Sequence, residues 1–345
     1  MVEVNMFFKI FLVVMTLLNV KNTVSAQGIN ITGLERTWTP PKKLSFSSYK
    51  NQIKETSLLG FSNIRLPIDL DYFLNKAPYK KQKAFRKLIN HIIHYTEKKN
   101  INLVLSNFNH GLEHANYKNK APKIAQDWIS LLNQLNINKK TENTIYLDIA
   151  NEPSLYPKEW EETAIFIINT IREKYPNFTV IYGSSNYNSI YELSRIEPIS
   201  FENIIYSFHF YEPFLFTHQG TEWTGDQFTT IGIPFPAPKD TSKMPPLTSL
   251  AKNTDAAINY RDYQHTGTYQ AINDKLNIVN KWKNQHNVEV WCTEFGVTEN
   301  ADKQSRINYL KAITEILLNF KIKGFIWEYK GNFGSSKKTL QKIYK

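Results

Sequence analysis

The stretch Thr144-Ile-Tyr-Leu-Asp-Ile-Ala-Asn-Glu-Pro153 is an apolar run that ends in a glutamate. Its β-branched and aromatic residues predict a buried β-strand, and Pro153 marks the end of that strand. A second run of this kind, Val288-Glu-Val-Trp-Cys-Thr-Glu-Phe-Gly296, also carries a glutamate at its end. In α/β barrels the carboxyl ends of the strands form the active-site rim. We therefore predict that Glu152 and Glu294 lie at one rim of a barrel and act across one bond.

Three further segments follow strand-like runs: Ile64-Arg-Leu-Pro67, Ser207-Phe-His-Phe-Tyr-Glu-Pro213 and Gly324-Phe-Ile-Trp-Glu-Tyr-Lys330. Together with the Asn-Glu-Pro ending at Pro153 and the Glu-Phe-Gly ending at Gly296, they resemble glycoside hydrolase family 5, the cellulase-type retaining glycosidases. Asn-Glu-Pro alone would recur by chance. The five matches, however, occur in chain order from about residue 64 to residue 330 and cover most of the chain.

Strand-like runs alternate with helix-like runs along the chain, which is typical of βα repeats and predicts a single-domain (β/α)8 TIM barrel. The predicted strands are residues 29–34, 63–66, 103–107, 145–150, 179–182, 203–208, 289–293 and 324–327. The predicted helices are residues 49–59, 80–98, 123–135, 157–174, a short one after Ser189, 269–285 and 302–320.

A long segment, residues 210–263, separates the sixth strand from the next long helix. Such long loops in compact domains are usually functional or disordered. The segment is rich in aromatic residues, which disordered chains lack. We predict that this loop folds over the rim and helps to form a substrate cleft, with Trp223 stacking on a sugar. The alternative is that its aromatic residues only pack the loop against the barrel.

The resemblance implies a role for each residue that matches the family's motifs. Glu152 would be the general acid/base and Glu294 the nucleophile, which requires environments that separate their two pKa values. Arg65 would hydrogen-bond the nucleophile and keep it ionised, although a structural ion pair with another carboxylate is the alternative. Asn151 would bind a sugar 2-hydroxyl group or, alternatively, cap the following helix.

The resemblance also assigns substrate-binding residues on three other strands. His209 and Tyr211 are two residues apart and so point the same way; they would position the substrate and the nucleophile. Trp327 would be a sugar platform, with a core tryptophan as the alternative. His110 would be the substrate-binding histidine that the family has near the end of the third strand. However, Ser106 stands where the family usually has an acidic residue, and His110 lies further toward the loop. Thr293 stands where the family commonly has glycine.

The N-terminal residues 1–26 have the layout of a signal peptide. Lys9 precedes an apolar run over residues 10–18, and Val24-Ser-Ala26 offers small residues at a cleavage site. A membrane anchor needs about 20 apolar residues, and polar residues interrupt this run too early. We therefore expect no stable membrane insertion and a catalytic domain over residues 27–345 that is secreted or periplasmic.

Composition limits the other possibilities. The formal net charge is +11, but the lysines are scattered, so we expect a solvated basic surface and no nucleic-acid partner. Attraction to anionic polysaccharides remains open. Cys292 is the single cysteine, and its place in an apolar strand predicts a buried packing residue. The histidines have no metal-ligand spacing and no phosphate loop occurs, so we expect no metal and no cofactor.

The sequence thus predicts a monomeric, retaining β-glycosidase that acts on a β-1,4-glucan, as an endoglucanase. A β-mannanase, a β-1,3-glucanase and a xyloglucan-active enzyme share the same chemistry and remain open. Outside this chemistry the alternatives are an inactive carbohydrate-binding barrel and a basic nucleic-acid-binding protein.

Overall fold

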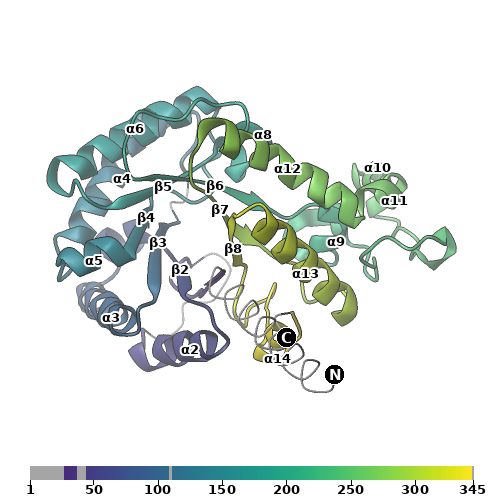
Figure 1. Cartoon of the computed structure of the whole chain (residues 1–345), viewed down its shortest axis with the longest axis horizontal. Coiled ribbons are helices and arrows are strands. Elements are labelled where there is room, and N and C mark those ends of the chain that lie inside the picture. Colours follow the sequence, from purple (N-terminus) through teal and green to yellow (C-terminus); the bar gives the residue numbers. More distant parts are fainter. Residues whose placement is uncertain (1–26, 37–43, 109–110, 344–345) are drawn as a thin grey trace, which may run out of the picture.

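The computed structural model describes residues 27–36, 44–108 and 111–343. In this part of the chain, eight parallel strands pair in sequence order and close into a barrel. They are β1 (Gly28–Asn30), β2 (Asn63–Ile68), β3 (Asn102–Asn107), β4 (Ile145–Asp148), β5 (Thr179–Gly183), β6 (Ile204–Phe210), β7 (Val290–Phe295) and β8 (Lys323–Ile326). Helices surround the strands (Figure 1), so the predicted (β/α)8 barrel is confirmed.

The long helices lie where the periodicity predicts them. They are α2 (Phe46–Leu58), α3 (Tyr79–Lys98), α4 (Tyr117–Leu132), α6 (Pro157–Lys174), α12 (Tyr269–His286) and α13 (Lys303–Asn319). In α3 the residues Phe85, Leu88, Ile89 and Ile92 are buried, and their three- and four-residue spacing turns one helix face to the barrel. The short helix predicted after Ser189 is α8 (Ile190–Leu193), whose Tyr191 N–H donates to the Ser189 hydroxyl.

Some elements differ from the prediction. β1 ends at Asn30 rather than residue 34, because only its first three residues pair with β2, and Leu34 then forms an isolated bridge with Ile68. Outside the long loop after β6, the elements η1 (Tyr72–Lys76), α5 (Lys139–Thr144), α7 (Ser185–Asn188) and α14 (Lys337–Ile343) were not predicted. Residues 1–26, the predicted signal peptide, and His110 lie outside the described residues.

The barrel interior is filled in two layers. Val104, Ile181, Ile205, Trp291 and Phe325 come from five different strands and form one apolar cluster. Beyond this cluster, toward the carboxyl ends of the strands, the inward side chains become polar and include Arg65, Ser106 and Asp148. The apolar layer stabilises the barrel, and the polar layer supports the site above it.

The long loop after β6 folds into short helical turns and projects from one side of the barrel (Figure 1). These turns are α9 (Phe214–Thr217), η2 (Glu222–Phe228), η3 (Thr241–Lys243), η4 (Ala251–Asn253), α10 (Ala256–Arg261) and α11 (Tyr263–Thr266). Phe216 and Phe235 are buried and pack on Tyr309 of α13. The loop is therefore anchored to the barrel wall by part of its aromatic residues.

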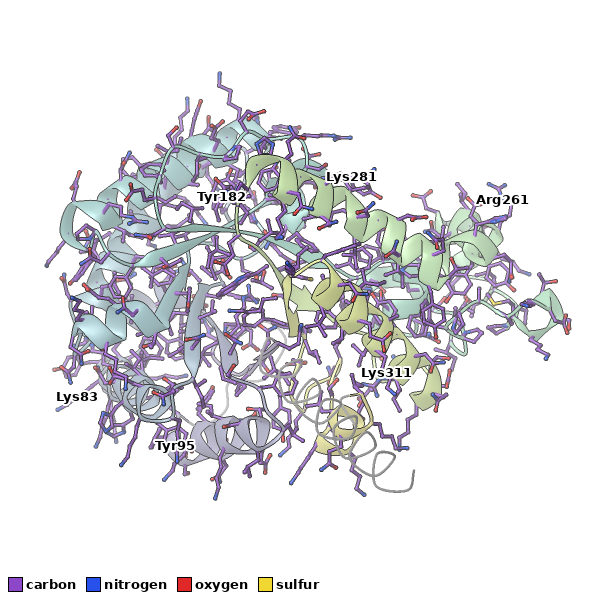
Figure 2. All side chains as sticks on the ribbon, in the orientation of Figure 1. Lys83, Tyr95, Tyr182, Arg261, Lys281 and Lys311 are labelled. Carbon is purple, nitrogen blue, oxygen red and sulfur yellow. The ribbon has the colours of Figure 1, made fainter. Side chains whose placement is uncertain are left out.

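Basic side chains are spread over separate elements. Lys83 on α3, Arg261 on α10 and Lys281 on α12 are exposed on different parts of the surface (Figure 2).

Cys292 is buried in β7, as predicted, and burial raises the pKa of its thiol well above the usual value. Over the described residues, no helix combines the length and the apolar character needed to span a bilayer.

Candidate active site

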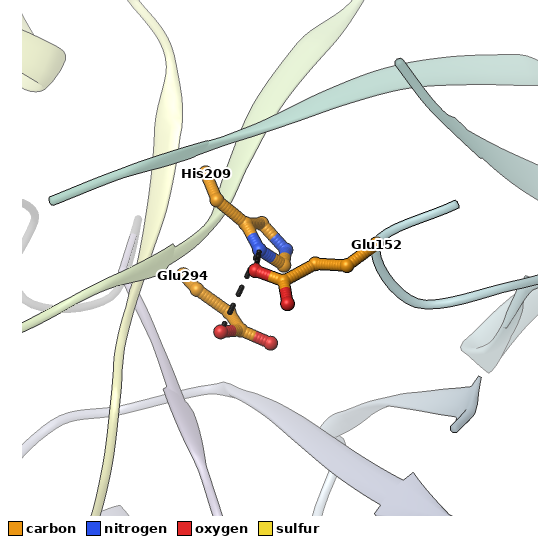
Figure 3. A group of neighbouring side chains, drawn as sticks. All are labelled: Glu152, His209 and Glu294. Atoms are coloured by element: carbon orange, nitrogen blue, oxygen red, sulfur yellow. Dashed lines mark hydrogen bonds and ion pairs between the residues drawn. The ribbon is translucent and has the colours of Figure 1, made fainter. Parts of the chain in front are cut away.

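Glu152 and Glu294 face each other across the barrel mouth. Glu152 follows β4 and Glu294 lies in β7; one oxygen of each carboxyl group and a ring nitrogen of His209 all lie within 4.8 Å of one another (Figure 3). His209 Nδ1 lies 2.7 Å from Glu152 Oε1 and 3.6 Å from Glu294 Oε2. The Glu152 side chain is 35% exposed, whereas the Glu294 side chain is 5% exposed. The structure thus brings the two predicted carboxyl groups together at one cleft.

The backbone positions both glutamates in unusual ways. Glu152 has a positive φ of 46°, which a non-glycine residue adopts only where its surroundings hold it there. In β7, Cys292 pairs with Phe208 and Glu294 pairs with His209, so Thr293 is an extra residue and forms a bulge. A bulge re-aims the side chain beside it. Thr293, the residue at which this chain has threonine in place of the expected glycine, is therefore the bulge residue directly before Glu294.

Arg65 is fully buried and holds Glu294. Its guanidinium donates to Glu294 Oε1 at 2.6 Å and to Asp148 Oδ2 at 2.9 Å. It also donates to Asn30 Oδ1 at 3.0 Å and to Asn151 Oδ1 at 2.6 Å. A buried guanidinium is stable only when its donors are satisfied. Both contacts foreseen for Arg65 are therefore present, the one to Glu294 and a structural ion pair.

The sequence analysis did not single out Asp148 as the second partner of Arg65. Ser106 donates to the same Asp148 oxygen at 2.7 Å, so a serine and an aspartate on neighbouring strands form this support together. The signal was available, because Asp148 is the charged residue within the apolar run of β4. A charge in a fully buried strand requires a partner of opposite charge.

Tyr211 supplies the second donor to Glu294. Its hydroxyl donates to Glu294 Oε2 at 2.8 Å, while its ring packs against Phe333. Glu294 therefore receives hydrogen bonds on both oxygens, from Arg65 and from Tyr211. Donors to a carboxylate favour its ionised form.

Burial raises the pKa of both glutamates, but their neighbours differ. Burial raises the pKa of Glu152 to about 7, and the charge of Arg65 only partly opposes this shift. Burial also raises the pKa of Glu294, but the charge and the hydrogen bond of Arg65 act against it. Burial lowers the pKa of His209 to about 4, so its ring is neutral at pH 7. The arrangement suits a protonated Glu152 beside an ionised Glu294.

The three side chains could also reach one cation. Glu152, His209 and Glu294 offer ligand atoms at a spacing that a metal ion could bridge. Glu294 is already neutralised by Arg65, and Glu152 is already bonded to His209. We therefore interpret the cluster as an acid–base site.

Trp327 lines the cleft but is largely covered. It is 6% exposed and stacks on Phe108, with ring centroids 5.9 Å apart and an angle of 13° between the planes. Phe333 completes this aromatic cluster. Trp327 is thus buried like a core tryptophan and also lines the cleft. Its role as a sugar platform stays a prediction.

The cleft has a volume of about 1210 Å³ and extends from the two glutamates over the loops after β5, β6, β7 and β8. It exceeds the range of about 300–1,000 Å³ that is usual for small-molecule pockets. Phe214 and Trp223 of the long loop line it and are 45% and 55% exposed. The loop therefore contributes both to barrel packing and to the cleft.

Trp223→Ala tests the predicted sugar contact. Because the indole is half exposed at the cleft and touches His218 edge-on, we expect KM for long oligosaccharides to rise about threefold to tenfold, with little change in the melting temperature. Steady-state kinetics and thermal unfolding measure both. A mutant that melts several degrees lower and keeps its KM would show that Trp223 only packs the loop.

Comparison with known proteins agrees with this geometry. The model of the family described as Cellulase (glycosyl hydrolase family 5) matches residues 22–333. The chain belongs to this family. It is therefore a glycoside hydrolase.

Individual glycosyl hydrolase family 5 relatives are distant. The chain is 28% identical to Endoglucanase 3 of Fibrobacter succinogenes over 89% of its own length, but it spans only 50% of that protein. It is 25% identical to Endoglucanase C of Acetivibrio thermocellus, over 88% of this chain and 90% of that protein. The fold matches the crystal structure of endoglucanase Cel5A from Thermotoga maritima with a TM-score of 0.72, at 21% identity, over 94% of this chain and 98% of that one.

Proposed function

We propose that the protein is a retaining endo-β-1,4-glucanase that cleaves its substrate by double displacement. The observation that supports this best is the spacing of the carboxyl groups, whose nearest oxygens lie within 4.8 Å. Retaining glycosidases hold the two groups about 5–5.5 Å apart, whereas inverting enzymes need about 6.5–9.5 Å to admit a water molecule. The spacing here supports the retaining arrangement.

In the first step, a Glu294 carboxylate oxygen bonds to the anomeric carbon as the glycosidic C–O bond breaks. Glu152 gives its proton to the departing oxygen. In the second step, water attacks the anomeric carbon, Glu152 takes a proton from that water, and the bond to Glu294 breaks. Breaking this bond leaves Glu294 as a carboxylate, which the hydrogen bonds from Arg65 and Tyr211 stabilise.

The charge of the cleft supports a neutral substrate. The lining contains one lysine, Lys330, and six glutamates: Glu152, Glu212, Glu222, Glu294, Glu299 and Glu328. Lys330 donates to Glu55, and Lys275 forms an ion pair with Glu212. With Glu152 protonated and with Glu212 and Glu294 paired to cations, the remaining glutamates still outnumber the single lysine of the lining, although the whole chain carries a net charge of +11. An acidic cleft disfavours anionic polysaccharides and suits an uncharged glucan.

The glucan specificity rests on the relatives, which are named endoglucanases. A β-mannanase, a β-1,3-glucanase or a xyloglucan-active enzyme would use the same carboxyl pair. A screen of purified protein against cellulose, glucomannan, laminarin and xyloglucan, with product analysis, separates them. No hydrolysis of any of these would instead favour the inactive carbohydrate-binding barrel.

The stereochemistry of the product tests the mechanism. We expect the first product to have the β anomeric configuration, because two inversions restore the starting configuration. Proton NMR of the fresh reaction mixture detects the anomeric signal before mutarotation. An initial α signal would contradict double displacement.

Export remains part of the proposal and rests on residues 1–26. N-terminal sequencing of the protein recovered outside the cytoplasm tests this proposal. Because removal of residues 1–26 leaves Gln27 as the first residue, we expect the sequence to begin there. The monomeric state likewise stays an expectation.

A further inference from the structure

A strained turn follows β5 and lies beside Glu152. Three consecutive residues adopt left-handed backbone angles: Asn186 (φ 51°), Tyr187 (φ 60°) and Asn188 (φ 56°). Asparagine tolerates this conformation, but it is a genuine outlier for a bulky residue such as tyrosine. Such conformations persist only where the surroundings determine them, and they cluster at binding and active sites.

The surroundings hold this turn on both sides. The Tyr187 N–H donates to the Pro153 carbonyl at 3.2 Å, which ties the turn to the residue after Glu152. Asn188 is fully buried against Gly183 at the end of β5, where an added Cβ would lie 2.5 Å from Asn188 Oδ1. The Ser184 hydroxyl also donates to the Ser189 carbonyl at 2.8 Å. The backbone of Tyr187 is therefore fixed relative to Glu152.

The side chain of Tyr187 is left open by this arrangement. It is 61% exposed and lines the same cleft as the two glutamates, and Tyr191 on α8 adds a second ring on this side that is 38% exposed. Exposed aromatic rings within a cleft mark a binding surface, because covering them removes apolar area from water. The left-handed backbone of Tyr187 places its ring at the cleft, which supports a role for this ring in binding.

The position of Tyr187 relative to Glu152 indicates which sugar it meets. Glu294 attacks the anomeric carbon, so the attacked sugar lies on the Glu294 side of the cleft, which Trp327 also lines. Glu152 protonates the oxygen of the sugar that departs, so that sugar lies on the Glu152 side, where the turn after β5 is fixed to Pro153. This step rests on the proposed function.

We propose that Tyr187 stacks on the departing sugar and makes the enzyme depend on a glycan chain that continues beyond the cleaved bond. Tyr187 is then a specificity residue for endo action rather than a catalytic residue. Covering one ring face with a pyranose ring supports an effect of about tenfold in kcat/KM.

Two substrates isolate this contact. Cellopentaose has a departing sugar chain, whereas β-cellobiosyl fluoride leaves a fluoride ion and has no ring on that side. We expect Tyr187→Ala to lower kcat/KM for cellopentaose about tenfold and to leave kcat/KM for the fluoride unchanged. Tyr187→Phe keeps the ring, and we expect near wild-type values on both substrates.

Two further variants control for folding and for surface effects. Tyr187→Gly removes the ring but adopts the left-handed conformation freely, so it keeps the test valid if the alanine variant folds poorly. Tyr79→Ala removes a tyrosine that is 72% exposed at the start of α3, outside the cleft lining, and we expect it to change neither rate.

The outcomes separate the two proposals. An unchanged rate on cellopentaose, or equal losses on both substrates in the well-folded glycine variant, would overturn the role of Tyr187. If the wild-type protein cleaves neither substrate, the proposed glucanase activity fails, and this is seen before any variant is compared.

Discussion

Glu294→Gln is expected to reduce kcat/KM for cellopentaose by roughly 10⁴-fold or more, because the amide keeps the shape of the side chain and loses the nucleophile. We expect the variant to fold, since Arg65 keeps its ion pair with Asp148 at 2.8 Å. We also expect it to bind cellopentaose nearly as well as the wild type. Initial rates, isothermal titration calorimetry and thermal unfolding measure the three properties.

Glu173→Gln is the matched control for this variant. Glu173 is exposed on α6 outside the cleft, so its substitution removes the same charge without touching the site. We expect wild-type rates for it. If Glu294→Gln also hydrolysed cellopentaose at close to the wild-type rate, Glu294 could not be the nucleophile, and the interpretation of the hydrogen bonds from Arg65 and Tyr211 would have to change.

The sequence predicted the features that depend on local periodicity. Strand runs such as residues 145–150 are apolar and end at polar residues or proline. Their order along the chain, and the glutamates that follow them, could therefore be located from the sequence. Element ends were less certain, as β1 shows. β1 ends at its third residue because that residue is the last to pair with β2. Such pairing depends on a strand that is distant in sequence, so local periodicity does not show where it stops. The helix α5 is polar and was missed, although Asn138 caps it through the N–H groups of Lys140 and Thr141.

Contacts across the barrel could not be derived from strand periodicity, which gives the face of a residue but not the partner that it meets. The bond from Arg65 to the nucleophile was expected from the family resemblance alone. Arg65 donates to Glu294, which is 229 residues further along the chain, and that contact follows from strand register and barrel closure. The partnership of Arg65 with Asp148 and the bulge at Thr293 arise in the same way. The left-handed turn at Tyr187 has no pattern in the sequence that we recognise.

Glu152→Ala is expected to slow cellopentaose hydrolysis by about 10²–10⁴-fold, which is the usual effect of losing a general acid. β-Cellobiosyl fluoride needs no proton to release its leaving group, so formation of the glycosyl-enzyme from it should be nearly unaffected. The second step then limits turnover, because no base activates the water. Azide attacks without a base, so adding it should restore part of the turnover and yield a β-glycosyl azide. Equal losses in kcat/KM for both substrates would instead indicate that Glu152 has a structural role.

The pH dependence of the wild type follows from the same residue. Glu152 must be protonated to act as an acid, and burial raises its pKa to about 7. The protonated fraction falls as pH rises through this value, so kcat/KM for cellopentaose should decline above pH 7 and approach a tenfold loss per pH unit. The rate on β-cellobiosyl fluoride should lack this limb, since its leaving group needs no proton. A matching alkaline limb on both substrates would assign the titration to another group, and Glu152 could no longer be identified as the acid from its pKa.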